Sequence, residues 1–269
     1  MPHSAFYRPS LVLKTKLALF LCILFSVLPT SAFAKPTTCS FDKFDRYEYV
    51  VKVYDGDTVK LANGQKIRLI GINAPEMNYG KGRPEPYAEL AKQLLIKKAL
   101  NQKIGLKFGA ERKDRYKRNL AHIFLKDGTN LQYSLLEKGY ASNIAIPPNL
   151  WQQKCYKVAE QIAKKSKKGI WQSNYFKPIK TTALNKNKTG YRHITGKIKS
   201  VEHTNGRIII SFINKLALQV HKSNKTYFNE FNFESLINKN VTVNGWVKMK
   251  NRKFTMNLKH PSAIEIEQL

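Results

Sequence analysis

Acidic residues are scarce in this chain: 18 Asp and Glu stand against 47 Lys and Arg among 269 residues, a formal net charge of +29. A charge this far from zero calls for a partner dense in negative charge. Nucleic acid is the interpretation we favour, and an anionic membrane surface or cell wall is the alternative. The 42% hydrophobic content is that of a globular protein, and the length allows one large domain or two small ones.

Long hydrophobic runs are also lacking. The apolar run 17–28 has twelve residues, too few to span a bilayer comfortably. Basic residues precede it, Pro29 ends it, and Ala32-Phe33-Ala34 has the small-x-small pattern of a cleavage site. We predict that residues 1–34 are a secretory signal removed after Ala34, with an uncleaved anchor as the alternative. Cleavage removes three basic residues and leaves +26 on a secreted or periplasmic protein without a stable membrane anchor.

Cysteine is rare as well, and no His/Cys cluster has the spacing of a zinc site. Two cysteines remain after cleavage, Cys39 and Cys155. Export to an oxidising compartment makes a disulfide between them plausible, which would tie the mature N-terminus to a late helix. Two free thiols remain the alternative.

The first half of the chain mixes strand and helix patterns. Tyr47, Tyr49, Val51 and Val53 alternate with polar or smaller residues, and Asn63-Gly64 is a hairpin signal between two further strands. Strands at 104–108 and 120–125 follow. Helices are expected at 87–100, with Leu90, Ala91, Leu94 and Leu95 on one face, at 130–138 and at 148–168. This order predicts an α+β fold with a small five-stranded barrel that carries helices.

The second half is mostly β. The apolar pattern lapses over 173–189, which we interpret as a linker. Strands are then expected at 191–201, 208–213, 216–221, 241–248 and 254–258, with a short helix at 233–238 before the fourth. Five strands with a helix between the third and fourth is the order of an OB-fold, so 190–269 is predicted to be an OB-fold-like domain. Both halves are basic, with net charges of +18 for 35–189 and +8 for 190–269.

Three blocks in the first half carry residue types suited to phosphodiester chemistry: Asp55-Gly56-Asp57-Thr58-Val59, Arg68-Leu69-Ile70-Gly71-Ile72-Asn73-Ala74-Pro75-Glu76, and Asp114-Arg115-Tyr116-Lys117-Arg118. Hard cations such as Ca²⁺ and Mg²⁺ prefer oxygen ligands, which Asp57 and its neighbours supply. A further carboxylate can accept a proton from water. Arginine offers a planar fork that matches phosphate oxygens.

These blocks, in this order and spacing, resemble the signature segments of the thermonuclease (staphylococcal nuclease-like) family over about residues 46–172, assigned here as domain 35–172. The resemblance implies that Asp57 is a direct Ca²⁺ ligand and that the backbone carbonyl of Ala74 also faces the cation, with Asp55 and Thr58 in support. It implies that Glu76 is the general base or positions the attacking water. Arg68 and Arg118 are expected to contact the scissile phosphate, with surface salt bridging as the alternative.

The chain departs from the family pattern at positions that matter for the metal and the nucleotide. Asn73 stands where the family often has a metal-binding Asp, and an amide gives an oxygen but no charge. Ile144 and Ile146 occupy a loop where tyrosines commonly pack on the nucleotide, with Tyr140 earlier. Lys117 replaces a common Gly beside Arg118 and offers a further phosphate contact.

Other residues are expected to shape or extend the nucleic-acid surface. Asp114 and Tyr116 are expected to form the turn and flank the nucleotide, with Arg115 beside them. In the second half, aromatic residues with neighbouring basic ones are candidates for binding a single strand: Tyr191, Phe212, Trp246 and Phe254, with Lys248, Lys250, Arg252 and Lys253. Core positions are the alternative, which we favour for Phe212 and Trp246. Docking to a wall polymer or a partner protein is a further alternative for this half.

The sequence therefore predicts a secreted nuclease that hydrolyses DNA and RNA with little sequence specificity. It is expected to depend on Ca²⁺, with Mg²⁺ or another divalent ion as alternatives, and to act as a monomer. The competing hypothesis is a weak or inactive nucleic-acid-binding envelope protein, which Asn73 keeps open. A third hypothesis is a surface adhesin that acts by charge alone. The retention of Asp57, Glu76, Arg68 and Arg118 favours the nuclease.

Overall fold

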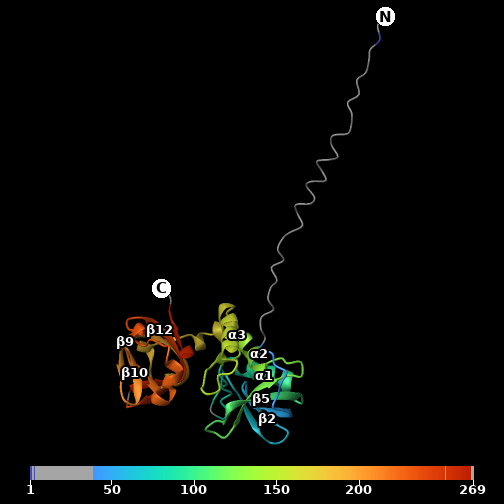
Figure 1. Ribbon diagram of the computed structural model, residues 1–269, viewed down its shortest axis with the longest axis horizontal. Helices are drawn as coiled ribbons and strands as arrows, with labels where there is room; N and C mark the ends of the chain where they lie inside the picture. Colours follow the sequence, from blue (N-terminus) through green and yellow to red (C-terminus); the bar gives the residue numbers. More distant parts are fainter. Residues whose placement is uncertain (2, 4–38, 81, 252, 268–269) are drawn as a thin grey trace. The chain divides into compact units, whose positions relative to one another are not determined.

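Five strands in the first half of the chain close into a barrel. The computed structural model describes residues 1, 3, 39–80, 82–251 and 253–267, so the expected signal segment lies outside the described residues, as does Arg252. In Figure 1 the barrel is drawn in blue to green. Its strand order is β1-β2-β3-β6-β5, with β3 and β6 parallel and the other neighbours antiparallel. The strands are β1 (Arg46–Val53), β2 (Thr58–Leu61), β3 (Lys66–Leu69), β5 (Lys103–Lys113) and β6 (Asn119–Phe124). The α+β prediction is confirmed.

The β2–β3 connection is the expected hairpin. Gly64 adopts φ +84°, a conformation that glycine reaches without a steric penalty, and its N–H donates to the Leu61 carbonyl at 2.9 Å. The Asn63 side chain accepts from the Gln65 N–H at 3.0 Å. The hairpin aligns Thr58 with Arg68, which brings the first two sequence blocks side by side.

The alternation noted in β1 does not mark its core face. Val50 and Val53 are buried, whereas Tyr47, Tyr49 and Val51 are each about half exposed. The pairing with β2 shifts register between Val50 and Lys52, and an extra residue at such a bulge breaks the two-residue period.

The barrel helices differ in detail from the sequence expectation. Helix α1 (Ala88–Ala99) buries Ala88, Ala91, Leu95 and Ala99, whereas Leu90 is 48% exposed, so its core stripe is rotated toward small residues. Helix α2 (Leu131–Glu137) begins after Asn130, whose side chain accepts from the Tyr133 N–H, and ends before Gly139 at φ +68°.

Helix α3 (Gln153–Lys165) is shorter than the expected 148–168. Residues 146–152 instead form turns, including a bridge between Ile146 and Asn149 and a Leu150 N–H bond to the Pro148 carbonyl. These backbone contacts compete with helical pairing. A disulfide joins Cys39 to Cys155 in α3, with 5.9 Å between their Cα atoms. The short strands β4 (Ile72–Asn73) and β7 (Ser142–Asn143) pair beside the barrel.

The second half of the chain forms a further β structure with its own buried core, drawn in orange in Figure 1. Its sheet order is β14-β12-β13-β11-β10-β9-β8, and β12 also pairs with β9. The circuit β9-β10-β11-β13-β12 therefore repeats the strand order of the first barrel, with β11 and β13 as the parallel pair. The strands are β8 (Ile179–Lys180), β9 (Gly190–His203), β10 (Arg207–Phe212), β11 (Leu216–His221), β12 (Asn240–Lys250), β13 (Lys253–Asn257) and β14 (Ile264–Ile266).

The short turns around this second sheet are 3-10 helices. The expected helix at 233–238 is the single turn η6 (Glu234–Leu236), and η5 (Lys222–Phe228) follows β11. The segment interpreted as a linker holds η2 (Asn174–Phe176), η3 (Thr181–Ala183) and η4 (Lys186–Lys188), and it buries Thr181 and Leu184 against the second core. Within the described residues, no helix is both long and apolar enough to cross a membrane.

Candidate active site

The two aspartates of the first block lie in the turn between β1 and β2. Asp55 accepts the Asp57 N–H at 3.0 Å through Oδ1, and the Tyr54 N–H bonds the Thr58 carbonyl at 2.9 Å. A Cβ at Gly56 would lie 2.5 Å from the Cβ of Ala91 and 2.7 Å from the Cβ of Ala74. Glycine is therefore required because helix α1 and the second block press directly on this turn.

Asp57 is the junction of the first two blocks. Its carboxylate is buried, and Oδ2 accepts the Ala74 N–H at 2.9 Å while forming an ion pair with Arg68 Nη2 at 2.9 Å. Its Oδ1 accepts from the Thr58 hydroxyl at 3.1 Å. Arg68 also donates to the Leu69 carbonyl at 2.8 Å and reaches Asn73 Oδ1 at 3.5 Å. These contacts hold together Asp57 just before β2, Arg68 in β3 and Asn73 in β4.

The third block is a turn built around Asp114. Its Oδ1 accepts the N–H groups of Tyr116 and Arg118 at 2.9 and 3.0 Å, and its Oδ2 binds Arg118 at 2.7 Å. Arg118 Nη1 approaches the Thr58 hydroxyl at 3.4 Å, which joins this turn to the first block. Tyr116 is exposed, and the guanidinium groups of Arg115 and Arg118 lie 4.7 and 5.4 Å from its ring centroid. These hydrogen bonds show that Asp114 shapes the turn.

Glu76 stands at the start of a loop that closes on itself. The Glu76 N–H donates to Glu85 Oε2 at 2.9 Å, and the Glu85 N–H donates to the Glu76 carbonyl at 2.9 Å. The Glu76 residue is exposed, leaving its carboxylate open to water. The sequence did not indicate a role for Glu85, which lies between Pro84 and Pro86 at the end of a Gly/Pro-rich loop.

The carboxylates of the site disfavour one another's charge. Burial and the neighbouring Asp57 charge raise the pKa of Asp55 to about 7. Partial desolvation and the Asp57 charge also raise the pKa of Glu76, opposed by Arg68 and Arg118. A raised carboxyl pKa beside a second carboxylate marks concentrated negative charge at one end of the barrel.

The oxygen atoms at this end suit a hard cation in kind. The expected ligand set is the Asp57 carboxylate, the Asn73 amide oxygen and the Ala74 carbonyl, and such oxygen donors are the ligands of Ca²⁺ and Mg²⁺. Among the described residues, no three His, Cys, Asp or Glu side chains form a metal-binding cluster, and the expected ligand set includes one carboxylate, that of Asp57. The negative charge shared by Asp55 and Asp57 is what a divalent ion would offset.

The other residues expected to contact nucleic acid lie on different elements. Tyr140 stacks on Tyr87, with ring centroids 6.4 Å apart. Lys117 is in the left-handed region at φ +62°, where glycine is easier to place. Lys248 lies on the second sheet and is exposed.

The aromatic candidates of the second half divide between core and surface. Phe212 and Phe254 are buried core residues, so Phe254 does not present a face to a strand. Trp246 is 42% exposed rather than core, and it packs edge-on against Tyr191 with centroids 5.1 Å apart. The reason is register: Val243, Gly245 and Val247 take the inward positions of β12, so Trp246 points outward.

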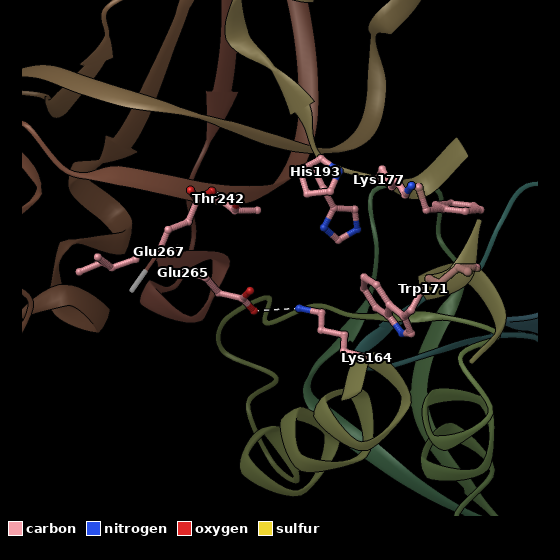
Figure 2. A pocket seen from close by; sticks show the side chains of 11 residues that line it. Lys164, Trp171, Lys177, His193, Thr242, Glu265 and Glu267 are labelled. Carbon is pink, nitrogen blue, oxygen red and sulfur yellow. Dashed lines mark hydrogen bonds and ion pairs between the residues drawn. The ribbon is translucent and has the colours of Figure 1, made fainter. Parts of the chain in front are cut away.

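A separate hollow lies between α3 and the second sheet. It has a volume of about 340 Å³ and contains none of the expected site residues. Figure 2 shows Lys164 of α3 facing Glu265 of β14, with His193 and Trp171 on the other side. Lys164 pairs with Glu265 at 2.8 Å and with Glu160 at 3.2 Å.

Known proteins match the region that holds this site. A family model described as a staphylococcal nuclease homologue matches residues 66–173, so Asp55 and Asp57 precede the matched segment. A thermonuclease of Staphylococcus hyicus is 34% identical over 126 residues, covering 45% of this chain and 73% of the relative. A thermonuclease of Staphylococcus intermedius is 33% identical over 128 residues, covering 46% and 76%. Endonuclease YncB of Bacillus subtilis strain 168 is 32% identical over 125 residues, covering 45% and 59%.

The fold and the site define the class: a five-stranded barrel with helices, in which carboxylate and guanidinium groups meet around Asp57 and Thr58. The chain belongs to the staphylococcal nuclease (thermonuclease) family, and the relatives compared above are nucleases by name. The match ends at residue 173, so the second sheet is an addition to the segment that defines the family.

Proposed function

We propose that this protein is a divalent-cation-dependent nuclease that hydrolyses phosphodiester bonds of DNA and RNA with little sequence preference. The observation that carries the proposal is the linked set Asp57, Thr58, Arg68, Ala74 and Arg118, whose contacts join all three sequence blocks. The net charge of +29 suits a polyanionic substrate.

The cation of choice is Ca²⁺, with Mg²⁺ or another divalent ion as the alternative. Asp57, Asn73 and the Ala74 carbonyl would hold it, and it would supply a positive charge that polarises a phosphoryl oxygen. Asp55 supports this set by holding the Asp57 backbone at 3.0 Å. Because Asn73 brings no charge, the affinity for Ca²⁺ is expected to be lower than with a second carboxylate.

Glu76 is the group that takes a proton from water or orients it. Glu76 is exposed, and partial desolvation with the nearby Asp57 charge raises its pKa, which makes it a better proton acceptor than an ordinary glutamate. Water attacks phosphorus and gives a proton to the Glu76 carboxylate, while the bond to the leaving oxygen breaks and that oxygen takes a proton from solvent.

Arg68 and Arg118 stabilise the charge that grows on the phosphoryl oxygens. A guanidinium has five N–H donors, and the contacts described for each arginine use three of them. The remaining donors can meet phosphate oxygens, while Asp57 and Asp114 keep each fork in a fixed orientation.

The alternative is a nucleic-acid-binding envelope protein with little or no turnover, which the neutral Asn73 favours. We place the protein outside the cell or in the periplasm, as a monomer of a nuclease domain (35–172) and an OB-fold-like domain (190–269) joined by 173–189. Trp246 and Lys248 on the second sheet are candidates for contact with the nucleic-acid strand.

Cleavage of plasmid DNA and of RNA by the purified protein tests the proposal, with Ca²⁺, Mg²⁺ or chelator present. Cutting that requires the cation supports the nuclease. Binding of both nucleic acids with no cutting at any cation concentration supports the alternative.

A further inference from the structure

Glu85 connects the Glu76 loop to residues beyond the family segment. One carboxylate oxygen, Oε2, accepts the Glu76 N–H at 2.9 Å. The other, Oε1, accepts the Tyr175 hydroxyl at 2.9 Å and lies 3.8 Å from Arg192 Nη1. Tyr175 belongs to η2 and Arg192 to β9 of the second sheet, so a single carboxylate joins the catalytic loop to both.

The partners of Glu85 are themselves fixed. The side chains of Arg192 and Glu85 are 19% and 17% exposed, which shields their ion pair from solvent. Arg192 also donates to the Tyr191 carbonyl at 2.7 Å, and its guanidinium lies 5.6 Å from the Tyr175 ring centroid. Desolvation and the adjacent Glu85 raise the pKa of Tyr175, so its hydroxyl remains a donor.

Other contacts hold the second sheet near α3 without involving Glu85. Lys164 of α3 pairs with Glu265 of β14 at 2.8 Å, the contact drawn in Figure 2. Arg192 is therefore presented to Glu85 by a sheet that has its own attachment to the barrel helices.

The Glu76 loop needs such a restraint. Residues 76–85 include Gly80 and Gly82, both at positive φ, and a glycine-rich segment loses much conformational freedom when it is ordered. The contacts of Glu85 close its two ends. A general base must hold its geometry within a fraction of an ångström for efficient proton transfer.

We propose that Arg192 and Tyr175 are positioning residues for the nuclease reaction: they hold Glu85, which in turn holds the backbone of Glu76. The second sheet thus completes the active site of the barrel. The role of Glu76 rests on the proposed function, whereas the restraint that Glu85 places on the loop follows from its contacts with Tyr175 and Arg192.

Substitution of the two partners tests this arrangement in the full chain. Arg192→Gln and Tyr175→Phe each remove one contact to Glu85. The matched controls are Arg207→Gln, which makes the same charge change at an exposed site of the second sheet, and Tyr47→Phe, which removes an exposed hydroxyl of the barrel. Two readouts are taken for every variant: kcat and KM for DNA cleavage, and backbone hydrogen exchange of the peptide that spans 76–87.

We expect Arg192→Gln to lower kcat roughly tenfold and Tyr175→Phe roughly threefold, with KM within about twofold of the wild type. Exchange across 76–87 rises at least about fivefold in both and stays at the wild-type rate in the controls. Arg192→Lys keeps the positive charge, so kcat and the slow exchange of peptide 76–87 should both lie between those of Arg192→Gln and the wild type. Glu265→Gln loosens the attachment of the second sheet but leaves Glu85 and its partners, so loop exchange stays near wild type.

Unchanged loop exchange in both Arg192→Gln and Tyr175→Phe overturns the proposal, whatever happens to activity. So does an equal rise in Glu265→Gln, since the effect would then come from attachment of the sheet and not from Glu85. If the wild type cleaves nothing but the loop exchange follows the expected pattern, the proposed function fails and the restraint on the loop stands.

Discussion

The Cys39–Cys155 disulfide leads to a quantitative prediction for stability. The bond closes a sequence separation of 116 residues, within which lies the whole barrel. The chain-entropy model gives about 4.8 kcal/mol at 25 °C for a loop of that length, because reduction returns that freedom to the unfolded chain. Since small domains are stable by about 5–15 kcal/mol, reduction should remove a large part of the barrel's stability.

The barrel should still fold when the bond is reduced, because aromatic contacts hold the same segment. Phe41 packs against Trp151 and Phe124, with ring centroids 4.8 and 5.8 Å apart. Urea unfolding followed by tryptophan fluorescence measures the effect, since Trp151 reports on this contact. With a urea m-value of about 2 kcal/mol/M, the midpoint should fall by about 2.4 M on reduction.

The matched control is the double variant Cys39→Ala/Cys155→Ala. It should unfold at the midpoint of the reduced wild type and should not respond to reductant. A shift below about 0.5 M on complete reduction, verified by thiol titration, would refute the entropic reasoning. It would mean that the unfolded chain is already restrained or that the bond contributes little.

Three further predictions concern the site and the second sheet. Arg118→Ala should lower kcat by about a hundredfold with a much smaller change in KM, because the guanidinium stabilises charge in the transition state. Steady-state kinetics measure both constants, and a change in KM alone would assign Arg118 to substrate binding. Asn73→Asp should lower the Ca²⁺ concentration needed for half-maximal cleavage, since it adds a carboxylate to the ligand set, and an unchanged Ca²⁺ titration would remove Asn73 from that set. Desolvation and the Lys164 charge lower the pKa of His193 to about 4 from an unfolded value of about 6.5. The neutral His193 side chain therefore contributes its full stability to the fold above pH 6.5, and this stability is lost as the pH falls toward 4. The stability of the wild type relative to His193→Gln should therefore shrink by about 2 kcal/mol between pH 8 and pH 5 in urea titrations, and a constant difference would contradict the buried neutral histidine.

Local sequence signals predicted much of the barrel. The Asn63-Gly64 hairpin and the Asn130 and Gly139 ends of α2 each depend on a few neighbouring residues, which is why they could be read directly. The core face of β1 could not be predicted from local signals, because the bulge at Val51 depends on the pairing of β1 with β2. For helix α1, the prediction placed Ala91, Leu94 and Leu95 correctly toward the core but was wrong for Leu90. The buried stripe extends instead to Ala88 and Ala99, small residues that hydrophobic patterns weigh lightly.

In the candidate site too, the sequence predicted features set by neighbouring residues but not those set by long-range contacts. The carboxylates and arginines could be identified from the three sequence blocks, and in the structure these blocks are joined through Asp57 and Thr58. Glu85 was missed because its importance comes from contacts with Tyr175 and Arg192, which lie 90 and 107 positions away in the sequence. Such long-range pairing leaves no periodic trace in the sequence.

The most direct test of the central claim is single-turnover cleavage of DNA by Glu76→Ala beside the wild type and Glu89→Ala, with Ca²⁺ at saturation. Glu89 is an exposed glutamate in the first turn of α1, so its variant makes the same change in charge outside the three sequence blocks. We expect Glu76→Ala to cleave at least about a hundredfold more slowly while binding DNA with unchanged affinity, and Glu89→Ala to behave as the wild type. Equal cleavage by all three proteins, or no cleavage by the wild type with DNA still bound, would contradict it.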